Sequence, residues 1–127
     1  MSPIPKADGP VFVTGAGGQL GRELHYKCKI EDVTVVALAR GQVDITNAEA
    51  VERAMRESRP SLVIHAAAAT DVNGCEEHRR AAYRVNVLGT WNVARSAANV
   101  GAAMVYVSTN YVFDGRKLGP YFEYDDT

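Results

Sequence analysis

The sequence lacks the features that would attach it to a membrane, to nucleic acid or to a metal ion. No apolar run approaches the ~18 residues that a membrane span needs, and residues 1–10 contain no apolar core of the kind found in signal peptides. Lys and Arg total 14 against 15 for Asp and Glu, and no basic run occurs. Because this balance gives no cationic surface, we expect no nucleic-acid partner and no membrane partner. No cluster of metal-ligating residues occurs in the sequence either, so no metal site is expected.

Cysteine is also scarce. Cys28 and Cys75 stand far apart, without a C-x-x-C motif or a histidine cluster, so neither a zinc site nor a disulfide framework is indicated. This usage is typical of reduced thiols in the cytoplasm. Residues 1–10 hold three prolines and one glycine and are predicted to be a flexible leader. The remaining residues, 11–127, suffice for one nucleotide-binding domain but not for an added substrate domain.

A glycine-rich turn follows the first apolar strand, Val11–Thr14, and leads into a helix. Gly15, Gly18 and Gly21 have the spacing T-G-x-x-G-x-x-G; position 20 is Leu, so the G-x-G-x-x-G form does not fit. A pattern of glycines is equally compatible with a surface turn that binds nothing. The strand before it and the helix after it favour a dinucleotide site, with a pyrophosphate on the free N–H groups of the helix N-terminus.

Hydrophobic periodicity predicts strands and helices in alternation. The expected helices are 19–29, 48–57 and 76–100, and the further strands are 33–39, 61–65 and 103–107. Thr46 or Asn47 should cap the second helix, Pro60 should stop it, and Gly101 should end the third. We therefore predict an α/β fold: a Rossmann-like parallel sheet with helices on both faces, incomplete, with four strands in the order 3-2-1-4.

The ends of the predicted strands carry the candidate site residues. Arg40 follows the second strand, where a guanidinium can pair with a 2′-phosphate, so NADP is favoured over NAD; the alternative is an arginine in solvent. Small residues, Ala66–Thr70, follow the third strand and would leave room for a cofactor, although four alanines could also start a helix. His65 fits a strand-end side chain better than a catalytic base. Asn86 would need a partner inside the fold.

Four motifs in register resemble the dTDP-4-dehydrorhamnose reductase family of the extended short-chain dehydrogenase/reductase superfamily. They are Thr-Gly-Ala-Gly-Gly-Gln-Leu-Gly, Val-Asp-Ile-Thr-Asn, Ile-His-Ala-Ala-Ala-Ala-Thr and Ser-Thr-Asn-Tyr-Val-Phe-Asp-Gly. The resemblance, which covers residue 11 onward, implies cofactor-binding and substrate residues. Together with the residue patterns above, the resemblance gives these candidate cofactor residues: Gly15, Gly18, Gln19, Leu20, Gly21, Arg40, Asp44, Ile45, Ala67, Ala68, Ala69 and Thr70. Thr109 matches the catalytic hydroxyl, and Thr109 and Asn110 lie on the substrate side. From the residues alone, Asp44 could instead shape its turn, and a Ser-Thr pair after a strand is common.

The sequence departs from the family pattern at three points. Asn110 stands where Ser-Thr-Asp is usual, and Asn73 stands where the family commonly has Asp. No Tyr has a Lys four residues later, so the family's Tyr-x-x-x-Lys pair is missing from these 127 residues. The resemblance implies the NAD(P)-binding part of a reductase that moves hydride from NADPH to a 4-keto nucleotide sugar, inactive as this chain. Relatives include a noncatalytic regulatory subunit of methionine adenosyltransferase, so a binding module stays open, as does a fragment with neither ligand nor activity.

We also expect self-association. Val85, Gly89, Val93 and Ala97 recur at every fourth position and form one apolar stripe on the helix 83–100. In a chain of this length the stripe would lack its neighbour, and the fourth strand would be an open edge. A homo-oligomer through that helix or that edge is the predicted outcome.

Overall fold

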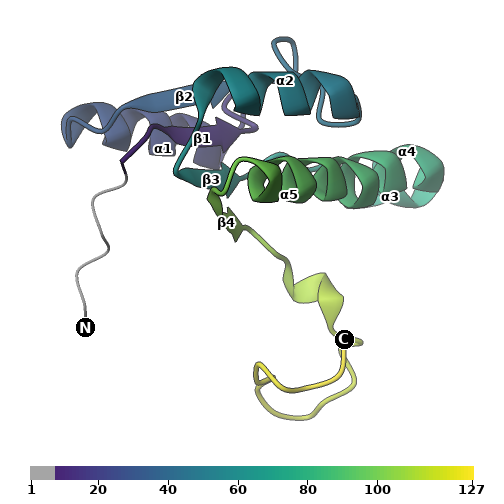
Figure 1. Cartoon of the computed structure of the whole chain (residues 1–127). Coiled ribbons are helices and arrows are strands. Elements are labelled where there is room, and N and C mark those ends of the chain that lie inside the picture. The colour runs from purple at the N-terminus through teal and green to yellow at the C-terminus, as the bar shows by residue number, and fades with distance from the viewer. Residues whose placement is uncertain (1–7) are drawn as a thin grey trace.

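The structure is a computed structural model that describes residues 8–127, and its centre is a four-stranded parallel sheet (Figure 1). The strands are β1 (Val11–Thr14), β2 (Val35–Leu38), β3 (Leu62–His65) and β4 (Ala103–Tyr106). The helices are α1 (Gln19–Ile30), α2 (Ala48–Ser58), α3 (Val72–Glu77), α4 (Arg79–Tyr83) and α5 (Thr90–Asn99). A π-helical segment, Arg84–Gly89, joins α4 to α5, and a short 3-10 turn, Asn110–Val112, follows β4. The predicted α/β class is confirmed.

The predicted strand order, 3-2-1-4, is wrong in one respect. The observed order is β2-β1-β3-β4, so β3 pairs with β1 rather than with β2. All four residues of β1 are buried, which requires a neighbouring strand on each side, whereas β2 is only half-buried and ends the sheet. From β1 the chain runs to β2 on one side of β1, and the connection after β2 then crosses back over β1 to reach β3 on its other side. The connections that follow β1 and β3 therefore separate at the carboxyl edge of the sheet, where doubly wound folds bind ligands.

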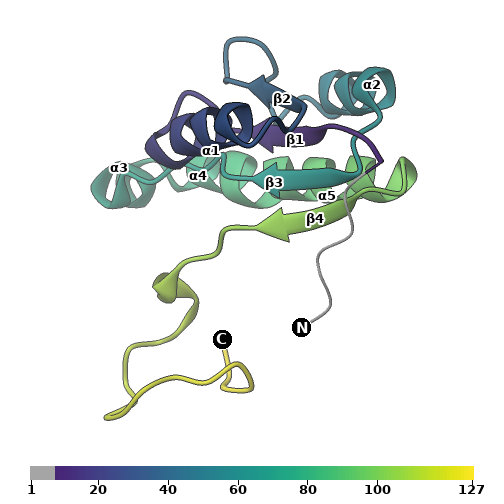
Figure 2. The same cartoon turned by 90° about the vertical axis from the view of Figure 1, so that its left-hand side faces the viewer.

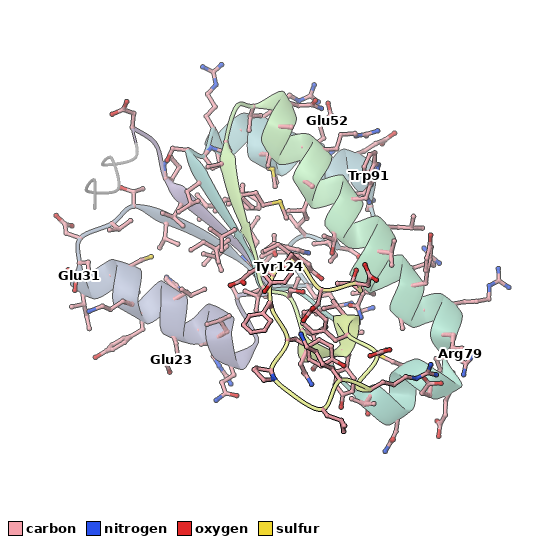
Figure 3. All side chains as sticks on the ribbon, turned by 90° about the horizontal axis from the view of Figure 1, so that it is seen from below. Glu23, Glu31, Glu52, Arg79, Trp91 and Tyr124 are labelled. Carbon is pink, nitrogen blue, oxygen red and sulfur yellow. The ribbon has the colours of Figure 1, made fainter. Side chains whose placement is uncertain are left out.

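Helices cover both faces of the sheet, as predicted. Figures 2 and 3 show α1 on one face, with α2 and the helical stretch that ends in α5 on the other. Alternate residues of the strands point to opposite faces, so Phe12 and Val63 pack with Met55, Val51 and Val93 from α2 and α5 in the buried core. This packing fixes the connections that leave the strands at the carboxyl edge.

Most of the predicted helix boundaries are confirmed, and the cause of each is visible. The Asn47 side chain accepts a hydrogen bond from the backbone N–H of Ala50 at 3.1 Å and so caps α2. Arg59, at φ 45°, ends α2 one residue before Pro60. Gly101 follows α5 at φ 73°, the left-handed conformation that glycine adopts without strain. Ala66–Thr70 is a loop and not the start of a helix.

The predicted helix 76–100 is helical but not continuous. Its first turn begins at Val72, and the backbone leaves the helical conformation at His78, at φ −120° and ψ 51°. The predicted apolar stripe exists, but its expected exposure is wrong. Gly89, Val93 and Ala97 are buried within this chain, against the Asp44–Ile45 turn and the core. The exposed apolar side chains of this stretch include those of Tyr83, Val87, Leu88 and Trp91, and Trp91 projects away from the sheet (Figure 3).

The segments before β1 and after β4 differ in how they contact the sheet. Seven residues of the predicted leader, 1–7, lie outside the described residues; of the others, Gly9 and Pro10 accept hydrogen bonds from Ser61 at the start of β3. After β4 the chain extends away from the sheet (Figure 2). β4 ends the sheet of the described residues, so the predicted edge strand is confirmed. Within residues 8–127, no helix is long and apolar enough to cross a bilayer.

Candidate dinucleotide site

The glycine turn has the close contacts that its sequence spacing predicts. Gly15 lies at φ 71°, and a Cβ on it would come within 2.7 Å of the Ala67 nitrogen, so the turn after β1 touches the loop after β3. A Cβ on Gly21 would overlap the Gly15 carbonyl and lie 2.6 Å from the Cα of Ala16. Gly18 closes the turn by donating its N–H to the Gly15 oxygen at 2.9 Å. Gly15 and Gly21 therefore allow close backbone packing, and Gly18 leads directly into α1.

A cavity of about 270 Å³ opens beside this turn. Its walls come from the glycine turn, from the stretch after β2, from the loop after β3 and from the π-helical segment. The lining residues are Gly15, Gly17, Gly18, Arg40, Val43, Asp44, Ile45, Ala66, Ala67, Ala68, Ala69 and Val85. Eight of the twelve predicted cofactor residues thus meet in one place. Stretches far apart in the sequence converge because the carboxyl ends of β1, β2 and β3 lie at one edge.

Four predicted cofactor residues do not line the cavity. Gln19 and Leu20 form the exposed start of α1, Gly21 is buried under the turn, and Thr70 lies exposed at the end of its loop. Conversely, Gly17, Val43, Ala66 and Val85 line the cavity but are not among the twelve predicted cofactor residues. Gly17 and Ala66 belong to the glycine turn and to the Ala66–Thr70 stretch, which the sequence had already indicated as parts of the site. For Val43 and Val85, no local signal could have shown that the fold brings them to the cavity.

The charged residues of the cavity have distinct surroundings. Arg40 is exposed and lines the cavity just after β2, and its pairing with a phosphate stays a prediction. The Asp44 carboxylate accepts hydrogen bonds from the Thr46 backbone N–H and from the Thr46 hydroxyl, both at 2.9 Å. These bonds, followed by the positive charges of Arg40 and Arg84, lower the pKa of Asp44 below its usual value. Asp44 therefore shapes its turn and also presents a stable negative charge to the cavity.

His65 is buried at the end of β3 and takes part in a chain of hydrogen bonds. Its Nδ1 lies 2.7 Å from the hydroxyl of Thr14, and its Nε2 lies 3.0 Å from the hydroxyl of Thr90. Thr90 donates its own hydrogen to the Asn86 carbonyl at 2.8 Å, so it must accept from Nε2–H, which leaves Nδ1 to accept from Thr14. Burial lowers the pKa of His65 to about 4. The imidazole is a neutral structural group, consistent with the strand-end role predicted for it.

Asn86 binds the backbone of the loop after β3. Its Oδ1 accepts from the Ala69 N–H at 2.8 Å, and its Nδ2 donates to the Ala69 carbonyl at 3.1 Å. The predicted need for a partner inside the fold is therefore met. This pair of bonds fixes the loop that forms one wall of the cavity.

Thr109 and Asn110 leave the carboxyl end of β4 and are exposed. The Thr109 hydroxyl accepts from the Tyr111 N–H at 3.2 Å and caps the 3-10 turn. Neither residue lines the cavity, although β4 ends at the same edge of the sheet as β3. Their predicted role on the substrate side stays a prediction. Among the described residues, no group of His, Cys, Asp and Glu side chains lies close enough together to hold a metal ion.

A parallel sheet covered by helices on both faces, with a glycine turn and a cavity at its carboxyl edge, defines a Rossmann-like α/β domain. Comparison with known proteins specifies the family. The RmlD substrate binding domain family matches residues 9–127, and the chain belongs to that family. The resemblance to dTDP-4-dehydrorhamnose reductases, predicted from the four motifs, is confirmed.

Individual relatives agree with this assignment. The dTDP-4-dehydrorhamnose reductase of Mycobacterium tuberculosis is 44% identical over 121 residues, which are 92% of this chain and 39% of the relative. The crystal structure of a Clostridium acetobutylicum dTDP-4-dehydrorhamnose reductase superposes with a TM-score of 0.88 at 43% identity, over 92% of this chain and 42% of that one. A Bacillus anthracis dTDP-4-dehydrorhamnose reductase in complex with NADP has a TM-score of 0.82 at 40% identity, over 86% and 39%. This chain thus spans about two fifths of the length of these relatives.

Proposed function

We propose that this chain is the NADPH-binding part of a reductase that acts on a nucleotide sugar. The single observation that carries the proposal is the cavity, where the glycine turn, Arg40, Asp44–Ile45 and Ala66–Ala69 meet. The Bacillus anthracis relative, whose structure was determined with NADP, supports the choice of cofactor. The predicted cytoplasmic location would suit a nicotinamide-dependent biosynthetic enzyme.

The residues present fit a dinucleotide. α1 begins at Gln19 with no side-chain cap and no acidic residue in its first turn, so its N-terminal N–H groups are available to a diphosphate. Gly15, Gly17 and Gly18 line the cavity there without a Cβ to obstruct the approach. At the end of β2, Arg40 can pair with a phosphate on the adenosine ribose, which supports NADPH over NADH. Asp44 and Ile45 would hold the adenine.

The reaction that we infer for the longer family enzyme is reduction of a 4-keto nucleotide sugar. When bound, the nicotinamide would supply the hydride. Thr109, at the end of β4, would donate a hydrogen bond to the carbonyl oxygen and stabilise the negative charge that develops there. The proton donor would be the family's Tyr, with its Lys one helical turn away. Because no Tyr of these 127 residues has that partner, we expect this chain to bind cofactor without turnover.

Titration of the chain with NADPH, followed by nicotinamide fluorescence, tests the proposal. We expect saturable binding that is lost in Gly18→Val, because the new side chain would occupy the place of the diphosphate. Gly41→Ala serves as a matched control, since no atom lies within 4 Å of the added Cβ. A chain that shows no binding while remaining folded would overturn the proposal.

A noncatalytic module that binds a dinucleotide is the second candidate, because the same cavity would serve it. Such a module would bind the dinucleotide as tightly as the reductase part. The coding sequence downstream of Thr127 separates the two: a continuation that contains Tyr-x-x-x-Lys supports the reductase, and a stop codon supports the module.

We further propose that the chain self-associates through the edge of β4. The buried stripe is excluded as the contact, but Val105 and Tyr106 on β4 are 51% and 47% exposed. An edge strand with such side chains is a ready site for pairing with a second copy. Light scattering over a concentration series should show a dimer that Val105→Lys disrupts. A monomer at the highest concentration would contradict this proposal.

A further inference from the structure

Two opposite walls of the cavity are held by one helical stretch, the π-helical segment and the first turn of α5. On one side, Asn86 binds the backbone of Ala69 through both of its side-chain polar atoms. On the other side, Asn92 donates its Nδ2 hydrogen to the Ile45 carbonyl at 3.0 Å. Between them, Gly89 lies so close to Ile45 that an added Cβ would come within 2.7 Å of its Cδ1 atom. The stretch 86–92 therefore forms a common support behind the cavity.

We propose that Asn86 is a positioning residue for the cofactor: its paired hydrogen bonds to Ala69 fix the Ala66–Ala69 wall at the separation that a dinucleotide needs. The inference rests on the proposed function, because the ligand whose wall is positioned is the dinucleotide. Asn86 itself does not line the cavity and would act through Ala69.

The Ala66–Ala69 loop has few other restraints. It contains no regular secondary structure, and the Ala69 carbonyl has one additional contact, the Cys75 thiol at 3.5 Å. An apolar residue at position 86 would leave the Ala69 N–H without its partner, and a partly buried group of this kind is costly to leave unpaired. The same loop lies against Gly15, whose added Cβ would come within 2.8 Å of the Ala66 carbonyl. Movement of the loop would therefore change the space beside the glycine turn.

The backbone carbonyl of Asn86 is in turn the last acceptor in the series of hydrogen bonds around His65. The Asn86 carbonyl accepts from Thr90, Thr90 accepts from His65, and His65 accepts from Thr14 at the end of β1. This chain connects the carboxyl ends of β1 and β3 to the helical stretch behind the cavity. A π-helical segment is rare in proteins and is concentrated at functional sites, which agrees with a positioning role.

The test uses the whole chain and compares Asn86→Ala with Asn99→Ala. Asn99 is an exposed asparagine at the end of α5 and serves as the matched control. NADPH affinity is measured by fluorescence under conditions in which each variant is folded. We expect binding about tenfold weaker in Asn86→Ala, equal to about 1.4 kcal/mol, and unchanged in Asn99→Ala. Equal affinity in wild type and Asn86→Ala would overturn the proposal.

Hydrogen exchange of the Ala69 amide, measured without cofactor, keeps the test independent of the proposed function. Exchange should be fastest in Asn86→Ala and intermediate in Asn86→Asp, whose carboxylate still accepts from this amide but cannot donate to the Ala69 carbonyl. The Asp variant also serves if the Ala variant does not fold. Unaltered exchange in Asn86→Ala would overturn the proposal that Asn86 holds this loop. If wild type does not bind NADPH, the proposed function fails, whereas the exchange data still decide whether Asn86 holds the loop.

Discussion

The Thr14 hydroxyl and His65 Nδ1 lie 2.7 Å apart, although the two residues are separated by 51 positions in the sequence. The bond joins the carboxyl ends of β1 and β3, the two strands whose connections enclose the candidate site. Since the Thr90 hydroxyl donates to Asn86, only the neutral Nε2–H form of His65 satisfies both threonines. The protonation state of His65 is therefore coupled to the folding of this edge.

We predict that acid destabilises the protein through His65. Its pKa falls from 6.5 in the unfolded chain to about 4 in the folded one. The unfolded state therefore binds more protons, so the stabilisation is complete above pH 6.5 and is lost as the pH falls towards 4. The contribution at stake is about 3 kcal/mol, at about 1.4 kcal/mol per pKa unit. Urea unfolding at pH 7, 5 and 4 measures it. His65→Gln, which does not titrate, should lose less stability over this range, and an equal loss would contradict the prediction.

The glycines of the turn should differ in what their substitution changes. Gly21→Ala places a methyl group against the backbone of Gly15 and Ala16 and should destabilise the fold by about 2–3 kcal/mol. Gly18 lies at φ −76°, and the atom nearest to an added Cβ, the Gly15 carbonyl oxygen, would be 3.3 Å away. Gly18→Ala should therefore retain most of the stability. Thermal unfolding of both variants makes the comparison. Equal melting temperatures for the two would contradict the packing role of Gly21.

Arg40 should determine the preference between the two nicotinamide cofactors. Arg40→Ala removes a charge-assisted bond to the 2′-phosphate, of about 1.5–3 kcal/mol, and should weaken NADPH binding roughly tenfold or more. NADH, which lacks this phosphate, should bind the variant and the wild type alike. Titrations with both cofactors measure the effect, and Arg53→Ala on α2 provides an arginine control. If Arg40→Ala weakens both cofactors equally, Arg40 is not the phosphate-binding residue.

The cap of α2 should contribute measurably to stability. In Asn47→Ala the Ala50 N–H loses its side-chain acceptor, and the free energy of unfolding should fall by about 1 kcal/mol. Asn99→Ala, at an exposed position, should have little effect. Urea denaturation of the two variants beside the wild type tests this. A loss in Asn99→Ala as large as that in Asn47→Ala would show that the effect is not due to capping.

Several parts of the site could be predicted because their cause is local. Gly15 follows a strand directly and Gly18 belongs to the same turn, whose conformation depends on the residues of the turn itself. The Asn47 cap and the left-handed Gly101 are likewise decided within a few residues. Arg40 and Ala67–Ala69 could be placed because each follows a strand, and parallel strands end at one edge of their sheet.

Other features depended on contacts between distant stretches. Val85 and Val93 share an apolar stripe, but its periodicity does not tell whether α2 of the same chain or a second copy covers it. The mistaken strand order has the same origin, since the position of β3 beside β1 depends on which edge of β1 remains free after β2 has paired. Thr90, which completes the His65 chain, carries no local signal at all.

The sequence by itself determined the alternation of strands and helices, the glycine turn and the small residues beside it, because backbone sterics and periodicity act over neighbouring residues. The tertiary structure decided the order of the strands, the burial of the stripe and the support of two cavity walls by the stretch 86–92. These require that side chains far apart in the chain share a core and satisfy one another's hydrogen bonds. Such pairing exists only after the chain has folded.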